Sequence, residues 1–580
     1  MAQSELSIIH SHLLAIYGQP AGDEAFERLC AILNPYIDLP PSQGNGSQDS
    51  LSERDSVLIT YADQLKESDT PSLQTLTGFC EQHLSGLVNS IHVLPFFPYS
   101  SDDGFSVVNY QAVRMEFGDW EDIARLGARF RLMFDAVINH VSVRHEWFQA
   151  FLRGDPDYQD YFIVMNGKPD LSQVVRPRAL PLLTEFNTPS GPKKVWTTFS
   201  ADQVDLNFQN PNVLLEIIDT LLFYIDHGAQ LIRLDAIAYL WKESGTSCIH
   251  LPQTHSIIKL FRAVLDVVAP HVLLITETNV PHQDNISYFG DGNDEAQMVY
   301  NFALPPLLLH TFYTGNSDHL SKWAAELKLP SKRTTFFNFL ASHDGIGVNP
   351  VRGILSDREI DDMIERTTWH GGLVSYKDDP GGAQVPYELN INYFDALSNP
   401  RSDESVATQV DRFMTAQAIM LALVGVPGIY FHSLFGSRSW REGFELTGRN
   451  RTINRQKFER TVFERELADE FSLRHHVFHR YAQLLRARSA SVAFHPYGEQ
   501  RILDYGEAIF ALLRLLPDGS PQVLCLHNIS NQPQLVMVNW KSVFQLSSGS
   551  LTDLITQTDY PLETNLVLKP YQTLWLRIKE

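Results

Sequence analysis

Cysteine is scarce in this 580-residue chain, which contains only four: Cys30, Cys80, Cys248 and Cys525. They are widely spaced and form no CxxC pair, which argues against a disulfide scaffold and a cysteine-based zinc site. Positive charge is also short, with 46 Lys and Arg against 68 Asp and Glu and a formal net charge of -22. This balance argues against nonspecific binding to nucleic acid or to an anionic membrane, so an anionic ligand would need its own cluster of Arg or Lys.

The chain also lacks a convincing membrane span and a secretory signal. Residues 413–431 are strongly apolar, but Gln417 lies inside this stretch and Pro427 interrupts it, so we expect a buried helix followed by a strand. The first residues show no basic segment followed by an apolar core. Together with the few, scattered cysteines, these features favour a cytoplasmic protein.

What the sequence does contain is a regular alternation of short apolar runs and helical stretches. Eight runs have strand character, at 57–61, 91–96, 131–138, 230–236, 271–277, 298–304, 334–342 and 425–431. Eight strands separated by helices predict a parallel (β/α)8 TIM barrel, a fold of the α/β class. After about residue 490, short alternating strands predict a C-terminal antiparallel β domain of the sandwich type.

The segments between these strands suggest the domain organisation. Connections 139–209, after strand 3, and 345–400, after strand 7, are too long for ordinary βα loops, so we expect two insertion subdomains that build a substrate pocket. The N-terminal residues have helical spacing and end in a soft linker, PPSQGNGSQDS. The expected parts are a helical extension at 1–52, the barrel at 53–138, 210–344 and 401–490, the two insertions, and the β domain at 491–580.

The stretch AQLIRLDAIAY, residues 229–239, carries two charges inside an otherwise apolar strand. Arg233 and Asp235 are two residues apart, so both side chains point to the same side of the strand. Burying such a pair costs several kcal/mol per ion unless both groups are well satisfied. The pair is therefore either a structural ion pair or part of a functional site.

Acidic residues end three of the predicted strands: Asp235, Glu277 in LLITETN and Asp344 in FLASHDG. Active sites of such barrels lie at the carboxyl ends of the strands, so we expect the three carboxylates to converge there. This set suits glycosyl transfer, in which one carboxylate attacks the anomeric carbon and another, with a raised pKa, protonates the leaving oxygen. Arg233 would keep Asp235 ionised, whereas desolvation would raise the pKa of Glu277.

Four motifs, DAVINH, IRLDA, ITETN and ASHD, match in order the signature regions of the α-amylase superfamily (glycoside hydrolase family 13). This resemblance implies that Asp235 is the nucleophile, Glu277 the general acid/base and Asp344 the transition-state stabiliser. It also implies residues that bind the sugar, with Asp102 and Arg455 paired across it. The sugar-binding set is Asp102, Phe105, His140, Phe199, Gln203, Arg233, His343 and Arg455.

Within the superfamily the chain is similar to the sucrose-phosphorylase group, and within that group to members that act on glucosylglycerate. The shared segments are SSDDGFSVVNY, RPRALPLLTEF, WTTFSADQVDLN, HDGIGV and YELNINYFDAL. The resemblance implies a retaining α-glucoside phosphorylase that works by double displacement, with a glucoside, glycerate or a similar acceptor, and inorganic phosphate as its ligands. The alternatives are sucrose, sucrose 6-phosphate or glucosylglycerol as the substrate, and behind these a hydrolase or transglucosidase.

The two insertions carry the residues expected around the acceptor. Arg178 and Tyr387 match phosphate-binding residues of the group, and Arg176 and Arg352 are further cations on the same two insertions. Each of the three arginines is either a pocket cation or an ordinary structural or surface residue. The last two acceptor-site residues depart from sucrose phosphorylase: Glu388 replaces a Gln, and Asn279 replaces a His. An acid at 388 would repel an anion unless it pairs with an Arg or binds acceptor hydroxyls.

The resemblance also bears on metals and assembly. Asn139 matches a position that ligates calcium in many amylases. The phosphorylase group generally does without calcium, so we expect no metal and no cofactor other than phosphate as co-substrate. A homodimer is compatible with the sequence.

Overall fold

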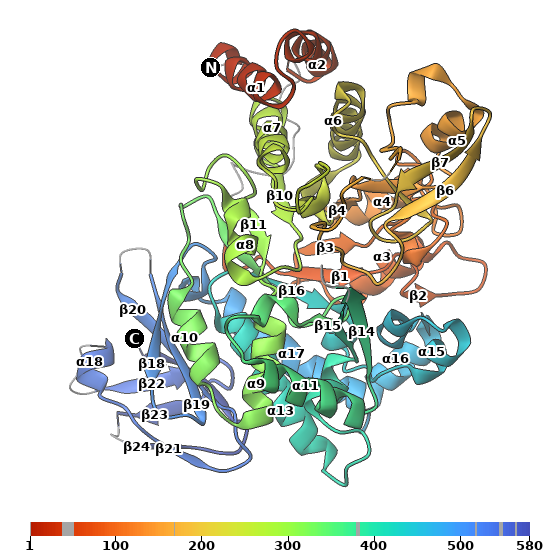
Figure 1. Cartoon of the computed structure of the whole chain (residues 1–580). Helices are drawn as coiled ribbons and strands as arrows, with labels where there is room; N and C mark the ends of the chain where they lie inside the picture. Colours follow the sequence, from red (N-terminus) through yellow and green to blue (C-terminus); the bar gives the residue numbers. More distant parts are fainter. Residues whose placement is uncertain are drawn as a thin grey trace.

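The computed structural model describes residues 2–37, 51–167, 169–378, 383–516, 519–544, 549–562 and 565–579. Its centre is a closed barrel of eight parallel strands (Figure 1). In sequence order they are β1 (Val57–Thr60), β3 (Ser90–Val93), β4 (Arg131–Ala136), β9 (Ala229–Leu234), β10 (Leu273–Thr276), β11 (Met298–Tyr300), β12 (Thr335–Asn338) and β16 (Val426–Tyr430). Each strand overlaps one of the eight predicted runs, so the predicted barrel is confirmed.

The barrel strands are short and apolar because helices or side chains cover both of their faces. All residues of β1 and of β16 are buried. The strand register determines which side chains meet at the carboxyl ends of the strands. Arg233 on β9 lies opposite Asp135 on β4 and Ile275 on β10. The carboxyl ends of these three neighbouring strands therefore meet at one rim.

Helices surround the barrel. Their bounds are α3 (Ser72–His83), α4 (Trp120–Gly127), α6 (Pro211–Asp226), α7 (Pro252–Val268), α8 (His282–Ile286), α9 (Leu304–Thr314), α10 (Asp318–Glu326), α13 (Val406–Ala422), α14 (Phe431–Leu434), α15 (Arg441–Thr447), α16 (Arg460–Ala468) and α17 (Leu473–Ser489). The buried helix α13 runs into strand β16, as predicted for residues 413–431. None of the helices in the described ranges combines the length and apolar character needed to cross a membrane.

The long connections form small elements above the rim. Residues 139–209 contain β5 (His140–Ser142), α5 (Glu146–Arg153), β6 (Leu183–Thr188), β7 (Gly191–Trp196) and β8 (Gln203–Asp205). Residues 345–400 contain β13 (Ile346–Gly347), α11 (Asp357–Trp369), β14 (Leu373–Asp378), β15 (Gln384–Asn390) and α12 (Tyr393–Leu397). Strand β15 lies between β13 and β14 in an antiparallel sheet, which brings residues 387 and 388 close to the chain that follows Asp344.

At the N-terminus, α1 (Ala2–Tyr17) and α2 (Ala21–Ile37) form a helical hairpin against α7 and α6 (Figure 1). The hydroxyl of Tyr17 donates a hydrogen bond to the carbonyl oxygen of Phe208 at 2.9 Å, which ties the hairpin to the barrel. The predicted linker PPSQGNGSQDS lies outside the described residues.

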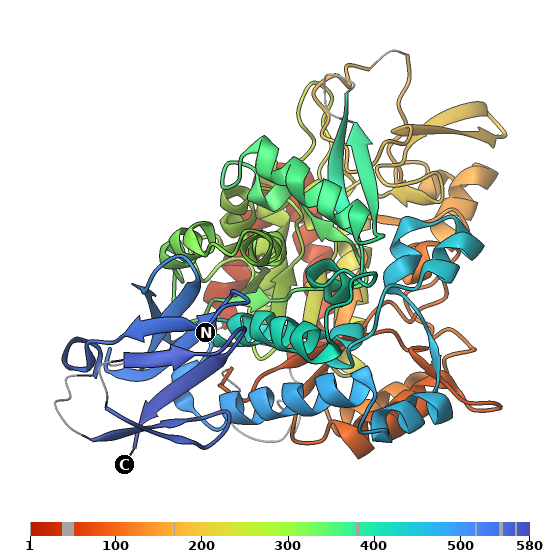
Figure 2. The same cartoon turned by 90° about the horizontal axis from the view of Figure 1, so that it is seen from below.

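The C-terminal part is an antiparallel β domain, as predicted. Its six-stranded sheet has the order β18 (Glu499–Asp504), β19 (Ile509–Leu515), β20 (Pro521–Asn528), β25 (Thr573–Ile578), β22 (Ser550–Asp553) and β23 (Asp559–Pro561). A ribbon of β21 (Gln534–Met537) and β24 (Asn565–Leu568), with α18 (Trp540–Phe544), shares a separate apolar core with this sheet. Figure 2 shows this blue domain on one side of the molecule, away from the yellow and green insertions.

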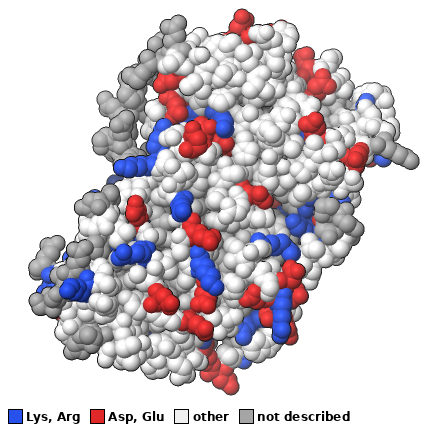
Figure 3. All heavy atoms as spheres, turned by 60° about the vertical axis from the view of Figure 1, so that its left-hand side comes forward, with Lys and Arg blue, Asp and Glu red and all other residues white. Residues whose placement is uncertain are grey.

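Charges on the molecular surface are mixed. On the face drawn in Figure 3, the described acidic and basic side chains are interspersed rather than gathered by sign. The described part of that face therefore offers no extended basic patch of the kind that nucleic acids require.

Candidate active site

A sharp turn at the end of β9 positions two of the predicted catalytic residues. Ala236 has φ 49° and ψ 33°, in the left-handed region that residues with a Cβ seldom adopt. Its N–H donates to Glu277 Oε2 at 3.0 Å, so the turn holds the carboxylate that ends β10. Such backbone strain costs about 1–3 kcal/mol and tends to occur at functional sites.

Arg233 is buried beneath this turn and contacts three carboxylates. Its Nη1 donates to Asp135 and, at 2.7 Å, to Asp235 Oδ1, while Nη2 lies 3.7 Å from Glu277 Oε2. Asp135 also accepts a hydrogen bond of 2.7 Å from His92 Nε2. The charged pair of the 229–239 stretch is therefore part of a larger network that joins β3, β4, β9 and β10.

This network gives the three acids different proton affinities. Burial raises the pKa of Glu277 to about 7, and the nearby charge of Asp235 adds to the effect against the opposing pull of Arg233. Burial also raises the pKa of Asp235. The charge of Arg233 opposes this rise, but Arg233 bonds to Asp135 as well as to Asp235. A Glu277 carboxyl with a pKa of about 7 would suit a proton donor, and Asp235, bound to Arg233, would suit a nucleophile.

Asp344 behaves in the opposite way. Burial acts to raise its pKa, but the charges of Arg451 and Arg455 and the neighbouring His343 outweigh burial and bring the pKa well below its usual range. Asp344 Oδ1 lies 3.4 Å from His343 Nε2 and 3.8 Å from Arg455 Nη2. Asp344 is therefore ionised at neutral pH.

Aromatic and polar side chains complete the inner wall. The ring of Phe105 stacks on His343 with centroids 4.6 Å apart and an interplanar angle of 2°. The carbonyl oxygen of Phe105 lies 2.8 Å from His140 Nε2 and accepts a hydrogen bond of 2.9 Å from Gln203 Nε2. The ring of Phe199 lies 5.2 Å from that of His140. The aromatic rings of this wall suit the apolar face of a sugar, and its amide donors suit the sugar hydroxyls.

The predicted Asp102–Arg455 contact is present, but Arg455 is shared. Its Nη1 lies 3.5 Å from Asp102 Oδ1 and 2.7 Å from Asp103 Oδ2. Its Nε donates to the carbonyl oxygen of His343 at 2.8 Å. Arg455 thus links the loop after β3 to the segment that carries Asp344.

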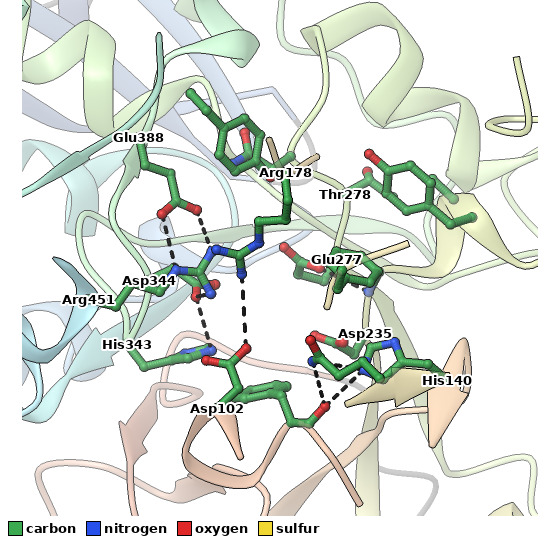
Figure 4. Close-up of a pocket in the computed structure, with 18 of the residues that line it drawn as sticks. Asp102, His140, Arg178, Asp235, Glu277, Thr278, His343, Asp344, Glu388 and Arg451 are labelled. Atoms are coloured by element: carbon green, nitrogen blue, oxygen red, sulfur yellow. Dashed lines mark hydrogen bonds and ion pairs between the residues drawn. The ribbon is translucent and has the colours of Figure 1, made fainter. Parts of the chain in front are cut away.

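One pocket at the barrel rim brings these residues together (Figure 4). Of the predicted site residues, Arg233 and Arg455 lie just behind the wall, in contact with its carboxylates, and all others line the pocket. The lining set is Asp102, Phe105, His140, Arg178, Phe199, Gln203, Asp235, Ala236, Ala238, Tyr239, Glu277, Thr278, Asn279, Val280, His343, Asp344, Tyr387, Glu388 and Arg451.

The acceptor side of the pocket contains one of the three insertion arginines. Arg178 extends towards Asp102, with Nη2 4.0 Å from Asp102 Oδ2 (Figure 4). Arg176 instead bonds to the carbonyl oxygen of Leu180, and Arg352 lies 3.6 Å from Asp357. Neither of these two arginines is among the residues that line this pocket.

Arg451 and Tyr239 line the pocket but were not predicted from the sequence. A signal existed for Arg451, which lies four residues before Arg455 in the run RTINRQ. The 3-10 helix η6 (Asn450–Asn454) directs both arginines to the pocket region. Arg451 also resolves the open question about Glu388, because the two side chains form a bidentate ion pair.

Asn139, which matches a calcium-ligating position of many amylases, contacts a lysine ammonium group. Lys242 Nζ lies 2.7 Å from Asn139 Oδ1 and 2.6 Å from Asp205 Oδ2. Lys242 is buried, and burial lowers its pKa while Asp205 opposes the change. Within the described ranges, no set of three His, Cys, Asp or Glu side chains is arranged to hold a metal ion.

Lys242→Met is expected to destabilise the protein, because it leaves Asp205 as a buried carboxylate without its counter-charge. Breaking one side of a buried pair typically costs about 3–5 kcal/mol. The double variant Lys242→Met/Asp205→Asn, which removes the lone charge, should recover part of the loss. Chemical denaturation measures both variants, and an unfolding free energy of Lys242→Met close to that of the parent would refute this role.

Comparison with known proteins gives a family for the chain. Residues 60–345 match the family described as alpha amylase, catalytic domain. The chain is 50% identical over 574 residues to a glucosylglycerate phosphorylase of Spirochaeta thermophila, with 97% of each protein covered. It is 47% identical over 526 residues to the glucosylglycerate phosphorylase of Escherichia coli K12, with 90% of this chain and 92% of the relative covered.

The fold comparison agrees with the sequence comparison. The solved structure of sucrose 6F-phosphate phosphorylase from Thermoanaerobacter thermosaccharolyticum matches with a TM-score of 0.72 at 24% identity, over 84% of this chain and 96% of that one. At this identity the match shows a shared fold only. The sequence identity of 47–50% over at least nine-tenths of the chain is decisive. The chain therefore belongs to the glucosylglycerate phosphorylase family of enzymes, within the sucrose-phosphorylase group of the α-amylase superfamily.

Proposed function

We propose that the protein catalyses the reversible phosphorolysis of 2-O-α-glucosylglycerate to α-D-glucose 1-phosphate and D-glycerate, with retention of configuration. The observation that carries this proposal is that Asp235, Glu277 and Asp344 line one pocket together with Arg178. The activity for which the relatives at 47–50% identity are named supports the choice of substrate.

In the proposed first step, Asp235 attacks the anomeric carbon while Glu277 gives its proton to the departing glycerate oxygen. The bond to glycerate breaks, and a β-glucosyl ester forms on Asp235. In the second step, a phosphate oxygen attacks the same carbon and the ester bond breaks. Glu277, now ionised, accepts the proton of the phosphate. Two inversions give net retention.

The contacts of Arg233 support these roles. A retaining mechanism needs its two carboxyl groups roughly 5–5.5 Å apart, and Asp235 and Glu277 both lie against this one guanidinium. The pKa of about 7 at Glu277 suits a group that donates a proton in one step and accepts one in the next. Asp344, ionised and beside the sugar wall, would favour the positive charge that develops on the ring.

Phosphate and glycerate are both small anions, so one cationic acceptor pocket could bind each in turn. Arg178 supplies a guanidinium to the pocket lining, where its contact with Asp102 is long at 4.0 Å and its planar fork suits phosphate or carboxylate oxygens. Glu388 does not oppose an anion with a free charge, because Arg451 pairs with it. Phosphate as the only co-substrate, without a metal, is part of this proposal.

Arg178→Ala is expected to raise the KM for phosphate by about 10–100-fold, because it removes a charge-assisted contact to the anion. Hydrolysis of α-glucosyl fluoride, which uses no anionic acceptor, should change little. The matched control is Arg176→Ala, on the same insertion but outside the pocket. Steady-state assays with each substrate measure the effect, and equal losses in both reactions would count against the acceptor role.

The experiment that tests the proposed function offers α-glucose 1-phosphate with four acceptors: glycerate, glycerol, fructose and fructose 6-phosphate. We expect glycerate to be glucosylated fastest. Faster transfer to another acceptor would replace the proposed substrate, and free glucose as the sole product would indicate a hydrolase. We also propose a cytoplasmic location, since all four cysteines carry free thiols, whereas the homodimer stays a prediction.

A further inference from the structure

Arg451 bridges two carboxylates in the pocket wall (Figure 4). Its Nε donates to Glu388 Oε2 at 3.1 Å and its Nη2 donates to Glu388 Oε1, while Nη1 forms an ion pair with Asp344 Oδ1. The side chain of Glu388 is only 1% exposed, and that of Arg451 is 16% exposed. Both oxygens of this buried carboxylate are bonded to Arg451, so Glu388 presents no unpaired negative charge to the acceptor.

Three separate segments build this bridge. Glu388 lies on β15 opposite Gly347 of β13, Arg451 lies on η6, and Asp344 precedes β13. The segments approach closely: a Cβ at Gly345 would lie 2.9 Å from the Cβ of Glu388. The fold therefore brings β15 directly against the chain that carries Asp344.

The bridge fixes the orientation of a side chain that would otherwise be flexible. The two bonds to Glu388 engage one edge of the Arg451 guanidinium and so define its plane. Other charged groups also face Asp344, but none of them reaches Glu388 in the described structure. They are Arg455 and Arg233, with Glu277 and Asp102 as like charges. His343 also faces Asp344, but burial brings the pKa of its imidazole well below the usual range.

We propose that Glu388 and Arg451 are positioning residues: Glu388 orients Arg451, and Arg451 holds the Asp344 carboxylate in place beside the donor sugar. Glu388 then acts without touching the acceptor, although it matches the position of an acceptor-site Gln in sucrose phosphorylase. The inference rests on the proposed function, in which Asp344 stabilises the transition state of glucosyl transfer.

Turnover of α-glucosyl fluoride separates this role from acceptor binding, because fluoride leaves without help from the acceptor pocket. Arg451→Met should lower kcat by about 100-fold and change KM less than about threefold. This pattern is expected when the lost contact stabilises mainly the transition state. Glu388→Gln should lower kcat by about tenfold, since it leaves the Arg451–Asp344 pair without its support. Arg449→Met is the matched control, because Arg449 is exposed and outside the pocket; its kcat should stay within about twofold.

The double variant tests whether Glu388 acts through Arg451. In the Arg451→Met background, Glu388→Gln should change kcat less than about twofold and raise the melting temperature, because it removes a buried carboxylate that has lost its partner. An equal tenfold loss in both backgrounds would overturn the proposal. If Arg451→Met does not fold, Arg451→Lys keeps the charge without the fork, and an unchanged kcat would overturn the proposal equally.

The fluoride assay also distinguishes the two levels of inference. If Arg451→Met slows phosphorolysis but not fluoride release, Arg451 binds the acceptor anion and the positioning role is wrong. If the parent enzyme does not release fluoride at all, the proposed glucosyl transfer itself fails. A kcat for fluoride release that decreases from the parent to Glu388→Gln and again to Arg451→Met supports the positioning role.

Discussion

Asp235→Ala is expected to abolish phosphorolysis, with kcat lowered by about 10⁵-fold or more. In the proposed mechanism Asp235 carries the oxygen that forms the glucosyl ester, and the two carboxylates nearest to it are held elsewhere. Glu277 is held by the N–H of Ala236, and Asp135 lies deeper, bound to Arg233 and His92. The fold should survive, because Arg233 keeps Asp135 as a partner.

A small anionic nucleophile provides the positive test for this assignment. Azide offered to Asp235→Ala with α-glucosyl fluoride should enter the space of the missing carboxylate and give β-glucosyl azide, the product of a single inversion. The anomeric configuration of the product is determined by NMR. The matched control is Asp361→Ala, on the exposed side of α11, which should keep kcat within about twofold. Retained phosphorolysis in Asp235→Ala would remove the nucleophile assignment.

Glu277→Gln is expected to slow the release of glycerate by about 10²–10⁴-fold, the usual contribution of a general acid. The effect depends on the leaving group, since an alkoxide of glycerate needs a proton and fluoride needs much less help. The fluoride burst of Glu277→Gln should therefore stay within about tenfold of the parent. Rapid-mixing measurements of both substrates give the comparison. Equal losses for the two leaving groups would point to a structural defect instead.

The same residue sets the expected pH dependence. The first step needs the protonated acid, and burial places the pKa of Glu277 at about 7. The rate of glycerate release should therefore be high below pH 7 and fall as the pH rises through this value. In Glu277→Gln the alkaline fall should disappear from the residual rate of glycerate release. A fall that persists with the same midpoint would assign it to another group.

The barrel and its acidic rim were predictable because both follow from local sequence. Strands buried on both faces are mostly apolar, as VLIT in β1 and VPGIY in β16 are, and they stand out against helical stretches. A closed parallel barrel then brings every strand end to one rim, whatever the distance along the chain. Asp235, Glu277 and Asp344 converge for this reason.

The acceptor side was less predictable, because its residues lie on insertions with no repeating geometry. Arg176 and Arg178 are two residues apart in one loop, yet only Arg178 lines the pocket while Arg176 bonds to Leu180. Loop conformation depends on contacts with the rest of the fold rather than on local pattern. The sequence identified both arginines as candidate pocket cations, but it did not show which of them lines the pocket.

The sequence by itself determined the fold class, the order of the catalytic motifs and the resemblance to one enzyme group, because strand periodicity and short motifs are local properties. Only the tertiary structure decided which charges meet. It paired Glu388 with Arg451 across 63 positions of sequence, and it placed Lys242 between Asn139 and Asp205. Ion pairs act over a few ångströms in space, and the chain carries no local signal of which distant residues will lie that close.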